Sequence, residues 1–174
     1  MAMVVKDLYL GLLSFPRHGL KLGIAAALGF SAFAVGFGLS SGLFTFAPVK
    51  YPNAYFLILT MVIFPSLLEE GIFRGLLIPR KVFSQSTRQQ WLYILGSSVI
   101  FVLWHPFNAF LFNTSAQLFF YDLRFLLIVM VLGVTCGYLY IKTHSLWPCV
   151  VVHWLTVVCW VFIFGGRNLL GEVA

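Results

Sequence analysis

Charged side chains are scarce in this chain. Only 9% of its 174 residues are Asp, Glu, Lys or Arg, against about 25% in ordinary soluble domains. Eleven basic and five acidic side chains cannot cover the surface of a soluble globule of this size. The shortage also excludes a disordered chain, because disorder depends on high charge and low hydrophobicity.

Cysteine is also scarce, with three residues. The composition excludes a disulfide-stapled secreted module. Cys136, Cys149 and Cys159 lack the C-x-x-C spacing of a metal or redox pair. We expect them to act as small core residues. The net charge of +6 comes from Lys and Arg scattered at the ends of apolar stretches, a pattern that reflects membrane topology and indicates no nucleic-acid partner.

Apolar residues dominate instead: they make up 61% of the chain, and the mean hydropathy is +0.97. About 20 helical residues cross a 30 Å hydrocarbon core, whereas barrel strands alternate and run only about 10 residues. The sequence therefore predicts an all-α, polytopic transmembrane bundle of about five spans. The predicted spans are Leu22–Val49, Tyr51–Leu68, Gln89–Tyr121, Phe125–Ile141 and Leu146–Gly165.

The first 21 residues have a different pattern. Apolar positions between Met3 and Phe15 are interrupted by Lys6 and Asp7, and Arg17 follows. This pattern suits a helix that lies on the lipid headgroups better than a span. We expect residues 1–21 to form an N-terminal interfacial segment and residues 22–174 a single transmembrane domain.

Basic residues orient the predicted bundle, because they concentrate in cytoplasmic loops. If the N-terminus is cytoplasmic, seven basic residues lie inside and three outside. The inner set is Lys6, Arg17, Lys21, Arg80, Lys81, Arg88 and Lys142, and the outer set is Lys50, Arg124 and Arg167. We expect a multi-pass protein of a bacterial-type plasma membrane, in contact with membrane lipids and with a cytoplasmic N-terminus.

Three charges stand where a membrane helix should avoid them. Glu69, Glu70 and Arg74 fall within six residues, and apolar residues continue on both sides; each charge at mid-membrane costs about 2.5–3.5 kcal/mol on insertion scales. Glu70 and Arg74 are one helical turn apart and can pair, whereas Glu69 lies about 140° round the helix from Arg74. The spacing predicts that Glu69 is a free general base and Glu70 its ion-paired, orienting neighbour. Pro65 breaks the backbone ladder one turn earlier.

Two histidines, His105 and His153, lie in other predicted spans, and polar groups in lipid must face the bundle interior. We expect both to converge on Glu69, although on a simple count His105 is the deeper of the two and needs a kink at Pro106 or a shifted span to come level. The three side chains could ligate Zn²⁺ with one position open for water. Alternatively, Glu69 and His105 activate water without a metal, and His153 polarises a carbonyl. The absence of an H-E-x-x-H helix favours the metal-free chemistry, with no cofactor.

These residues resemble the motifs of the CPBP family (CAAX proteases and bacteriocin-processing enzymes, also called Abi), which includes the type II CAAX prenyl endopeptidases. Residues 69–74 fit E-E-x-x-x-R, residues 101–105 fit F-x-x-x-H, and residues 133–153 resemble the last conserved block. The similar core covers about residues 55–158. The resemblance implies a glutamic-type intramembrane endopeptidase whose substrate is a membrane-associated or lipidated peptide.

Carried over, the resemblance implies that Glu69 activates water with help from His105. It implies supporting roles for Glu70 and Arg74 and an oxyanion-holding role for His153. The last motif usually reads H-x-x-x-N, but Val157 stands in place of the asparagine. Losing one oxyanion donor typically costs about 10²–10³ in rate, and Thr156 is the candidate to compensate.

Two alternatives remain at this point. The first is a catalytically weak family member that acts as a membrane scaffold, an immunity factor or an accessory subunit, with other membrane subunits as partners; Val157 favours it. The second is a small transporter or channel that uses Glu69, Glu70 and the histidines as a proton or ion relay. No internal repeat or pair of broken helices supports the transporter.

Overall fold

The computed structural model describes residues 2–14 (side chains from Val5), 19–49 and 54–166. The predictions for Arg17, Lys50 and Arg167 lie outside these described residues. The α-helices are α1 (Ala2–Leu13), α2 (Leu20–Ser40), α3 (Ala54–Met61), α4 (Leu68–Glu70), α5 (Thr87–Leu111), α6 (Gln117–Phe120), α7 (Leu123–Thr143) and α8 (Trp147–Phe162). Turns of π-helix form η1 (Val62–Leu67) and η2 (Gly71–Leu76), and turns of 3₁₀-helix form η3 (Arg80–Ser84) and η4 (Thr114–Ala116).

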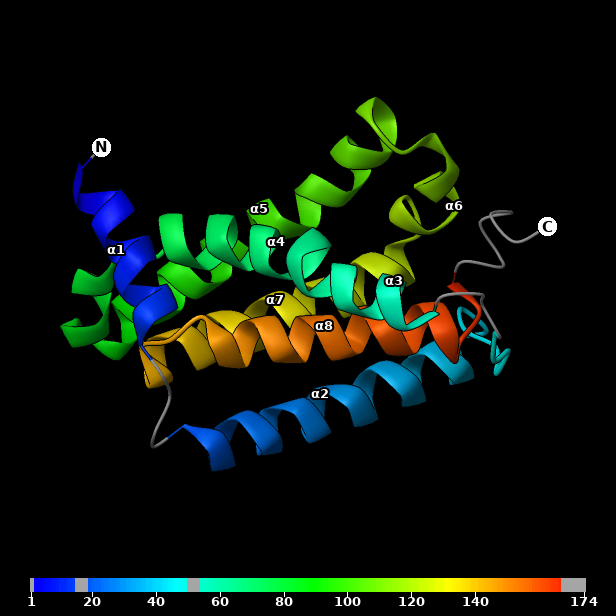
Figure 1. The fold of residues 1–174 in the computed structure, drawn as a ribbon, viewed down its shortest axis with the longest axis horizontal. Helices are drawn as coiled ribbons and strands as arrows, with labels where there is room; N and C mark the ends of the chain where they lie inside the picture. The colour runs from blue at the N-terminus through cyan, green and yellow to red at the C-terminus, as the bar shows by residue number, and fades with distance from the viewer. Residues whose placement is uncertain (1, 15–18, 50–53, 167–174) are drawn as a thin grey trace.

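The described residues form a helical membrane bundle without β-strands, as the sequence predicts (Figure 1). Four helical segments are long and apolar enough to span a membrane: Leu20–Ser40, Ala54–Leu76, Thr87–Leu111 and Leu123–Thr143. The fifth, α8, is apolar but has 16 residues. At 1.5 Å per residue it is about 24 Å long, somewhat shorter than the hydrocarbon core.

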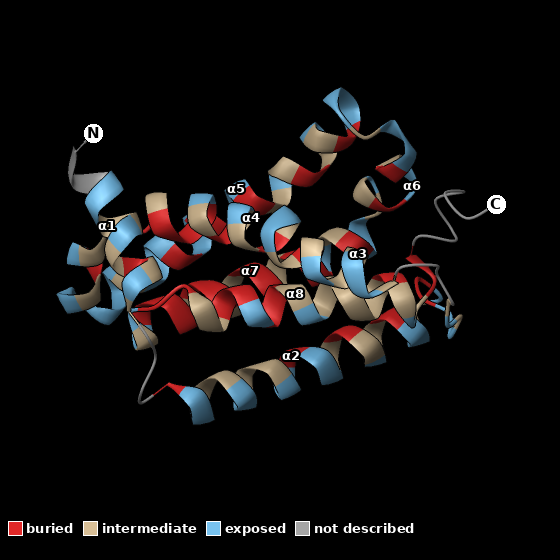
Figure 2. Cartoon of the chain, in the orientation of Figure 1, coloured by how far each residue is buried: buried red, intermediate tan, exposed pale blue. Residues whose placement is uncertain are grey.

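Helix α7 is the centre of the bundle, and Figure 2 shows it buried along most of its length. It packs closely on α5 because two of its glycines leave room. A Cβ at Gly133 would lie 3.0 Å from the Cβ of Ser98, and one at Gly137 would lie 3.1 Å from Ile94. The spacing of small residues along α7 therefore brings the two backbones together, as it does in other membrane helices.

The second span is interrupted where the sequence predicts a break. Phe64 has non-helical dihedrals (φ −121°, ψ 116°) directly before Pro65, which lacks the N–H that would continue the ladder. The π-helical turn η2 follows the two glutamates and leaves backbone groups outside the α-helical pattern. One of them, the carbonyl of Phe73, accepts a 2.6 Å hydrogen bond from the hydroxyl of Ser97 on α5.

The stretch predicted as one span, Gln89–Tyr121, is not a single helix. Helix α5 ends at Leu111, where the carbonyl of Asn108 accepts the backbone N–H groups of both Phe112 and Asn113. The chain then turns back through η4 and α6, and Gln117 donates to the carbonyl of Ala109. Thirty-three residues exceed what one span needs, and the surplus forms this returning segment against the bundle.

Helix α1 crosses the end of the bundle instead of running along it (Figure 1). Leu8 packs against Gly75, where a Cβ would lie 2.5 Å from the Leu8 Cδ1 atom. The indole N–H of Trp147 donates to the carbonyl of Leu12 at 2.8 Å. Val5, Tyr9 and Leu13 of α1 are exposed. The position of this helix relative to the headgroups stays a prediction.

Candidate active site

Glu70 and Arg74 form a fully buried ion pair, as their spacing predicts. The Nε atom of Arg74 lies 3.1 Å from Oε2 of Glu70, and both side chains are 0% exposed. Arg74 also donates to the carbonyl of Gly133 on α7 at 3.1 Å. The pair therefore ties the second span to the central helix and neutralises one of the two carboxylates inside the bundle.

His153 joins this pair from α8. Its Nδ1 atom lies 2.8 Å from Oε1 of Glu70, and the ring is almost completely buried. Its other nitrogen, Nε2, lies 3.8 Å from Oε2 of Glu69. That separation is longer than a direct hydrogen bond. His153 thus stands between the two glutamates, and Glu70 fixes the orientation of its ring.

Glu69 is the less constrained carboxylate. Its side chain is 14% exposed, whereas that of Glu70 is 0% exposed. One oxygen faces His153, and the other, Oε1, accepts a 3.1 Å hydrogen bond from the indole N–H of Trp104. Glu69 therefore retains room for a further contact from the cavity beside it, as a general base requires.

His105 is held by its own helix. Its Nδ1 atom lies 2.9 Å from the carbonyl oxygen of Phe101. A carbonyl can only accept, so Nδ1 carries the proton and Nε2 of the neutral ring is an acceptor. Phe120 of α6 packs on the ring edge to face, with centroids 4.9 Å apart. The returning segment after α5 thus fixes the position of this ring.

The ring of Phe101 lies at the centre of these groups. Its centroid is 4.6 Å from Cζ of Arg74, 5.0 Å from the ring centroid of His105 and 5.7 Å from that of His153. The two imidazoles therefore reach one region, although they differ in depth on the simple count. Figure 1 shows the second half of α5 leaning away from the bundle, and Pro106 interrupts the hydrogen-bond ladder there.

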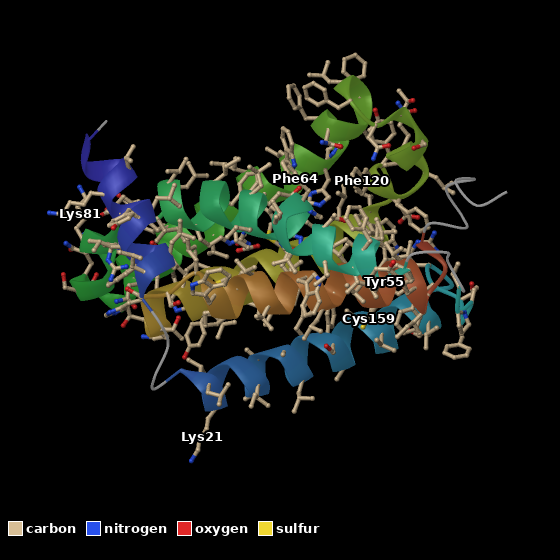
Figure 3. All side chains as sticks on the ribbon, viewed as in Figure 1. Lys21, Tyr55, Phe64, Lys81, Phe120 and Cys159 are labelled. Carbon is tan, nitrogen blue, oxygen red and sulfur yellow. The ribbon has the colours of Figure 1, made fainter. Side chains whose placement is uncertain are left out.

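Glu69, His105 and His153 line one cavity of about 880 Å³. Its wall is mostly apolar; Phe64, Phe120 and Cys159, labelled in Figure 3, are three of its lining residues. Phe64 and Leu68 line the cavity and are also exposed on the outside of the bundle. The cavity therefore reaches the lipid-facing surface along the second span.

Val157, which stands where the motif usually has asparagine, lies at the site. Val157 lines the cavity, as does its neighbour Thr156. The hydroxyl of Thr156 donates to the carbonyl of Val152 at 2.8 Å, so this proton is already engaged within α8. Thr156 is therefore a poor substitute for the missing amide.

Sequence reasoning missed two residues of this site. Trp104 bonds Glu69, and Asn108 lines the cavity with a side-chain amide that has no hydrogen-bond partner among the described residues. The sequence offers a signal for Asn108, which follows His105 by three residues and so shares roughly its helix face. It offers none for Trp104, because its contact with Glu69 joins residues 35 apart in the chain.

Glu69, His105 and His153 are the ligands that the zinc alternative requires. No three His, Cys, Asp or Glu side chains within the described ranges are grouped so that they could hold an ion. The Nδ1 atoms of His105 and His153 are engaged by Phe101 and Glu70. Each ring would therefore bind a metal through Nε2, and the zinc alternative stays a prediction.

The fold and the site together define a helical integral membrane protein with a carboxylate–histidine cluster beside an apolar cavity. Residues 51–159, more than half of the chain, match the family of Rce1-like type II CAAX prenyl endopeptidases. The chain belongs to this family of intramembrane endopeptidases, whose substrates are membrane-associated peptides. No curated protein and no solved structure matches the chain.

Proposed function

We propose that the protein is a glutamic-type intramembrane endopeptidase in which Glu69 is the general base. The observation that carries the proposal is that the two glutamates differ in their partners. Both oxygens of Glu70 are engaged, one by Arg74 and one by His153. Glu69 faces the cavity, and its Oε2 atom lies 3.8 Å from Nε2 of His153. A base must be within reach of the water that it deprotonates.

In this proposal Glu69 takes a proton from water as the water oxygen attacks the carbonyl carbon of the peptide bond. His105 accepts the second hydrogen bond from that water through Nε2, because its Nδ1 proton is held by Phe101. Glu69 then returns its proton to the amide nitrogen as the C–N bond breaks. Glu69 thus acts first as base and then as acid.

His153 is the proposed oxyanion donor. The role requires a proton on Nε2 of His153, the nitrogen that faces Glu69. Its Nε2–H donates to the oxyanion, while Glu70 holds the ring through Nδ1. Val157 supplies no second donor, so we expect turnover to be slow.

The proposed substrate is a peptide that carries a long apolar group, the prenyl chain of a CAAX C-terminus being the type named in the family description. The apolar wall of the 880 Å³ cavity suits such a chain. A lipidated C-terminus of another kind, a C-terminal sorting segment and a bacteriocin-type leader are the alternative substrates. Each presents its scissile bond near the membrane face.

The proposal is tested with purified protein in liposomes and a fluorogenic, farnesylated CAAX peptide. We expect Glu69→Gln to lower kcat at least about 10³-fold, because it removes the base and leaves the side-chain shape. Asp122→Asn is the matched control: it makes the same chemical change at an N-cap outside the cavity, and we expect wild-type turnover. Cleavage by Glu69→Gln at the wild-type rate would refute the proposal.

A second candidate function is a membrane scaffold or accessory subunit without turnover. Val157 in the cavity wall favours it. Val157→Asn discriminates between the two, because an added amide donor raises kcat about 10²-fold in a functional site and changes nothing in a scaffold. Val157→Thr, of similar volume and without an amide, is the control.

A further inference from the structure

Trp104 connects helix α5 to the second span at the candidate active site. It lies on α5, and its indole N–H donates at 3.1 Å to Oε1 of Glu69, which belongs to the second span. Both residues line the cavity. Among the described residues, this is the direct hydrogen bond that the Glu69 carboxylate makes to another helix. Nε2 of His153 lies farther away, 3.8 Å from Oε2 of Glu69.

The indole ring is itself held in place. Its centroid lies 6.5 Å from that of Phe73, 6.1 Å from Phe107 and 6.5 Å from Phe112. Phe107 and Phe112 are exposed on the outside of the bundle, so the ring lies between the cavity and the lipid-facing surface. A fixed ring can present its N–H in one direction only.

The hydrogen bond selects which oxygen of Glu69 is free to react. Oε1 is engaged by Trp104, so Oε2 is left facing His153 and the cavity. A carboxylate on a flexible side chain samples several rotamers, and only those that point its free oxygen at the water are productive. A donor on one oxygen removes the unproductive orientations before the substrate arrives.

We propose that Trp104 is a positioning residue that holds Glu69 in its reactive orientation through the indole N–H. The inference deepens the proposed function and rests on it. Trp104 touches no reacting atom, and the effect of its N–H passes through Glu69. Loss of the N–H, with the shape of the cavity wall kept, is therefore expected to lower kcat and leave KM unchanged.

The first test compares variants with the farnesylated peptide assay. Trp104→Phe keeps an aromatic ring and removes the N–H; we expect kcat to fall about 10- to 100-fold, the effect of losing a hydrogen bond to a charged group. Replacement of Trp104 by β-(3-benzothienyl)alanine, which keeps the shape of tryptophan in the cavity wall and lacks the N–H, is expected to give the same fall in kcat with KM within twofold. Trp147→Phe is the control, because it removes an indole hydrogen bond to Leu12 at the far end of the bundle and leaves kcat unchanged.

The second test needs no turnover. The protein contains five tryptophans; their indole N–H signals are to be recorded in a ¹⁵N–¹H spectrum in detergent, with Trp104 assigned from Trp104→Phe. We expect Glu69→Gln to shift the Trp104 indole proton upfield, because the acceptor loses its charge, and to leave the Trp91 and Trp147 signals in place. An unmoved Trp104 signal overturns the inference whether or not the peptide is cleaved.

The two proposals fail in different ways. If Glu69→Gln is inactive and Trp104→Phe retains wild-type kcat, only the positioning role is wrong. An equal fall in kcat for Trp104→Phe and Trp147→Phe also overturns it, because the loss is then one of general stability. Retained cleavage by Glu69→Gln overturns both proposals.

Discussion

The residues of the site divide into those whose pairing is local in sequence and those whose pairing is not. Glu70 and Arg74 are one turn apart, and the helical period alone brings them together. His153 reaches Glu70 across 83 residues. The local pair supplies the charge balance, and the distant histidine turns it into a site that faces Glu69.

At this scale we predict different structural costs for the two glutamates. Glu70→Gln leaves Arg74, which is 0% exposed, without its ion pair, and breaking a buried pair by removing one partner costs about 3–5 kcal/mol. Glu69→Gln removes no ion pair with Arg74, so we expect a loss below about 1 kcal/mol. Unfolding titrations with SDS in mixed micelles measure both values, and equal losses would contradict the prediction.

The helices follow the apolar pattern of the sequence closely, but the pattern does not predict every point at which a helix ends. The break before Pro65 is predicted, since proline removes a ladder hydrogen bond. The end of α5 at Leu111 is not, because the predicted span is bounded by charge alone and residues 112–121 carry no charge. The cluster Asn113, Thr114 and Ser115, which is typical of a turn, is the signal that this criterion misses. Hydropathy measures what lipid tolerates, and it does not distinguish a helix that continues from a segment that turns back against the bundle.

At the scale of elements we predict that the α5–α7 contact depends on Gly133. Gly133→Ala places a Cβ 3.0 Å from the Cβ of Ser98, and overpacking of this kind costs about 1–3 kcal/mol. Gly96→Ala on α5 is the matched control, because no atom lies within 4 Å of a Cβ there, and we expect no loss. The same unfolding titration compares them; an equal effect at both positions would show that the close approach is unimportant.

The whole molecule has one strongly basic end. Lys21 begins α2, Lys81 lies in η3, Arg88 is in the first turn of α5 and Lys142 in the last turn of α7; Lys21 and Lys81 are labelled at this end in Figure 3. Arg124 lies at the other end, where it donates to the carbonyl of Ser41 and to Asp122. This hydrogen bond from Arg124 holds the pKa of Asp122 below its usual value.

For the whole molecule we predict that the basic end is cytoplasmic. In right-side-out vesicles a membrane-impermeant maleimide is expected to label Arg124→Cys and to leave Lys81→Cys unlabelled until the vesicles are opened. Wild-type protein is the control for the native cysteines, of which Cys136 and Cys149 are buried. Labelling of Lys81→Cys in sealed vesicles would reverse the orientation.

The sequence by itself determines the class of this protein and indicates where its candidate site lies. Few charges and long apolar stretches require a helical membrane bundle, and the cost of Glu69, Glu70 and Arg74 in lipid marks the site, because both depend on composition and local spacing alone. The tertiary structure decides which groups meet. It brings His153 between the glutamates and Trp104 onto Glu69, since contacts between distant helices depend on how the chain turns and packs, which no local period encodes.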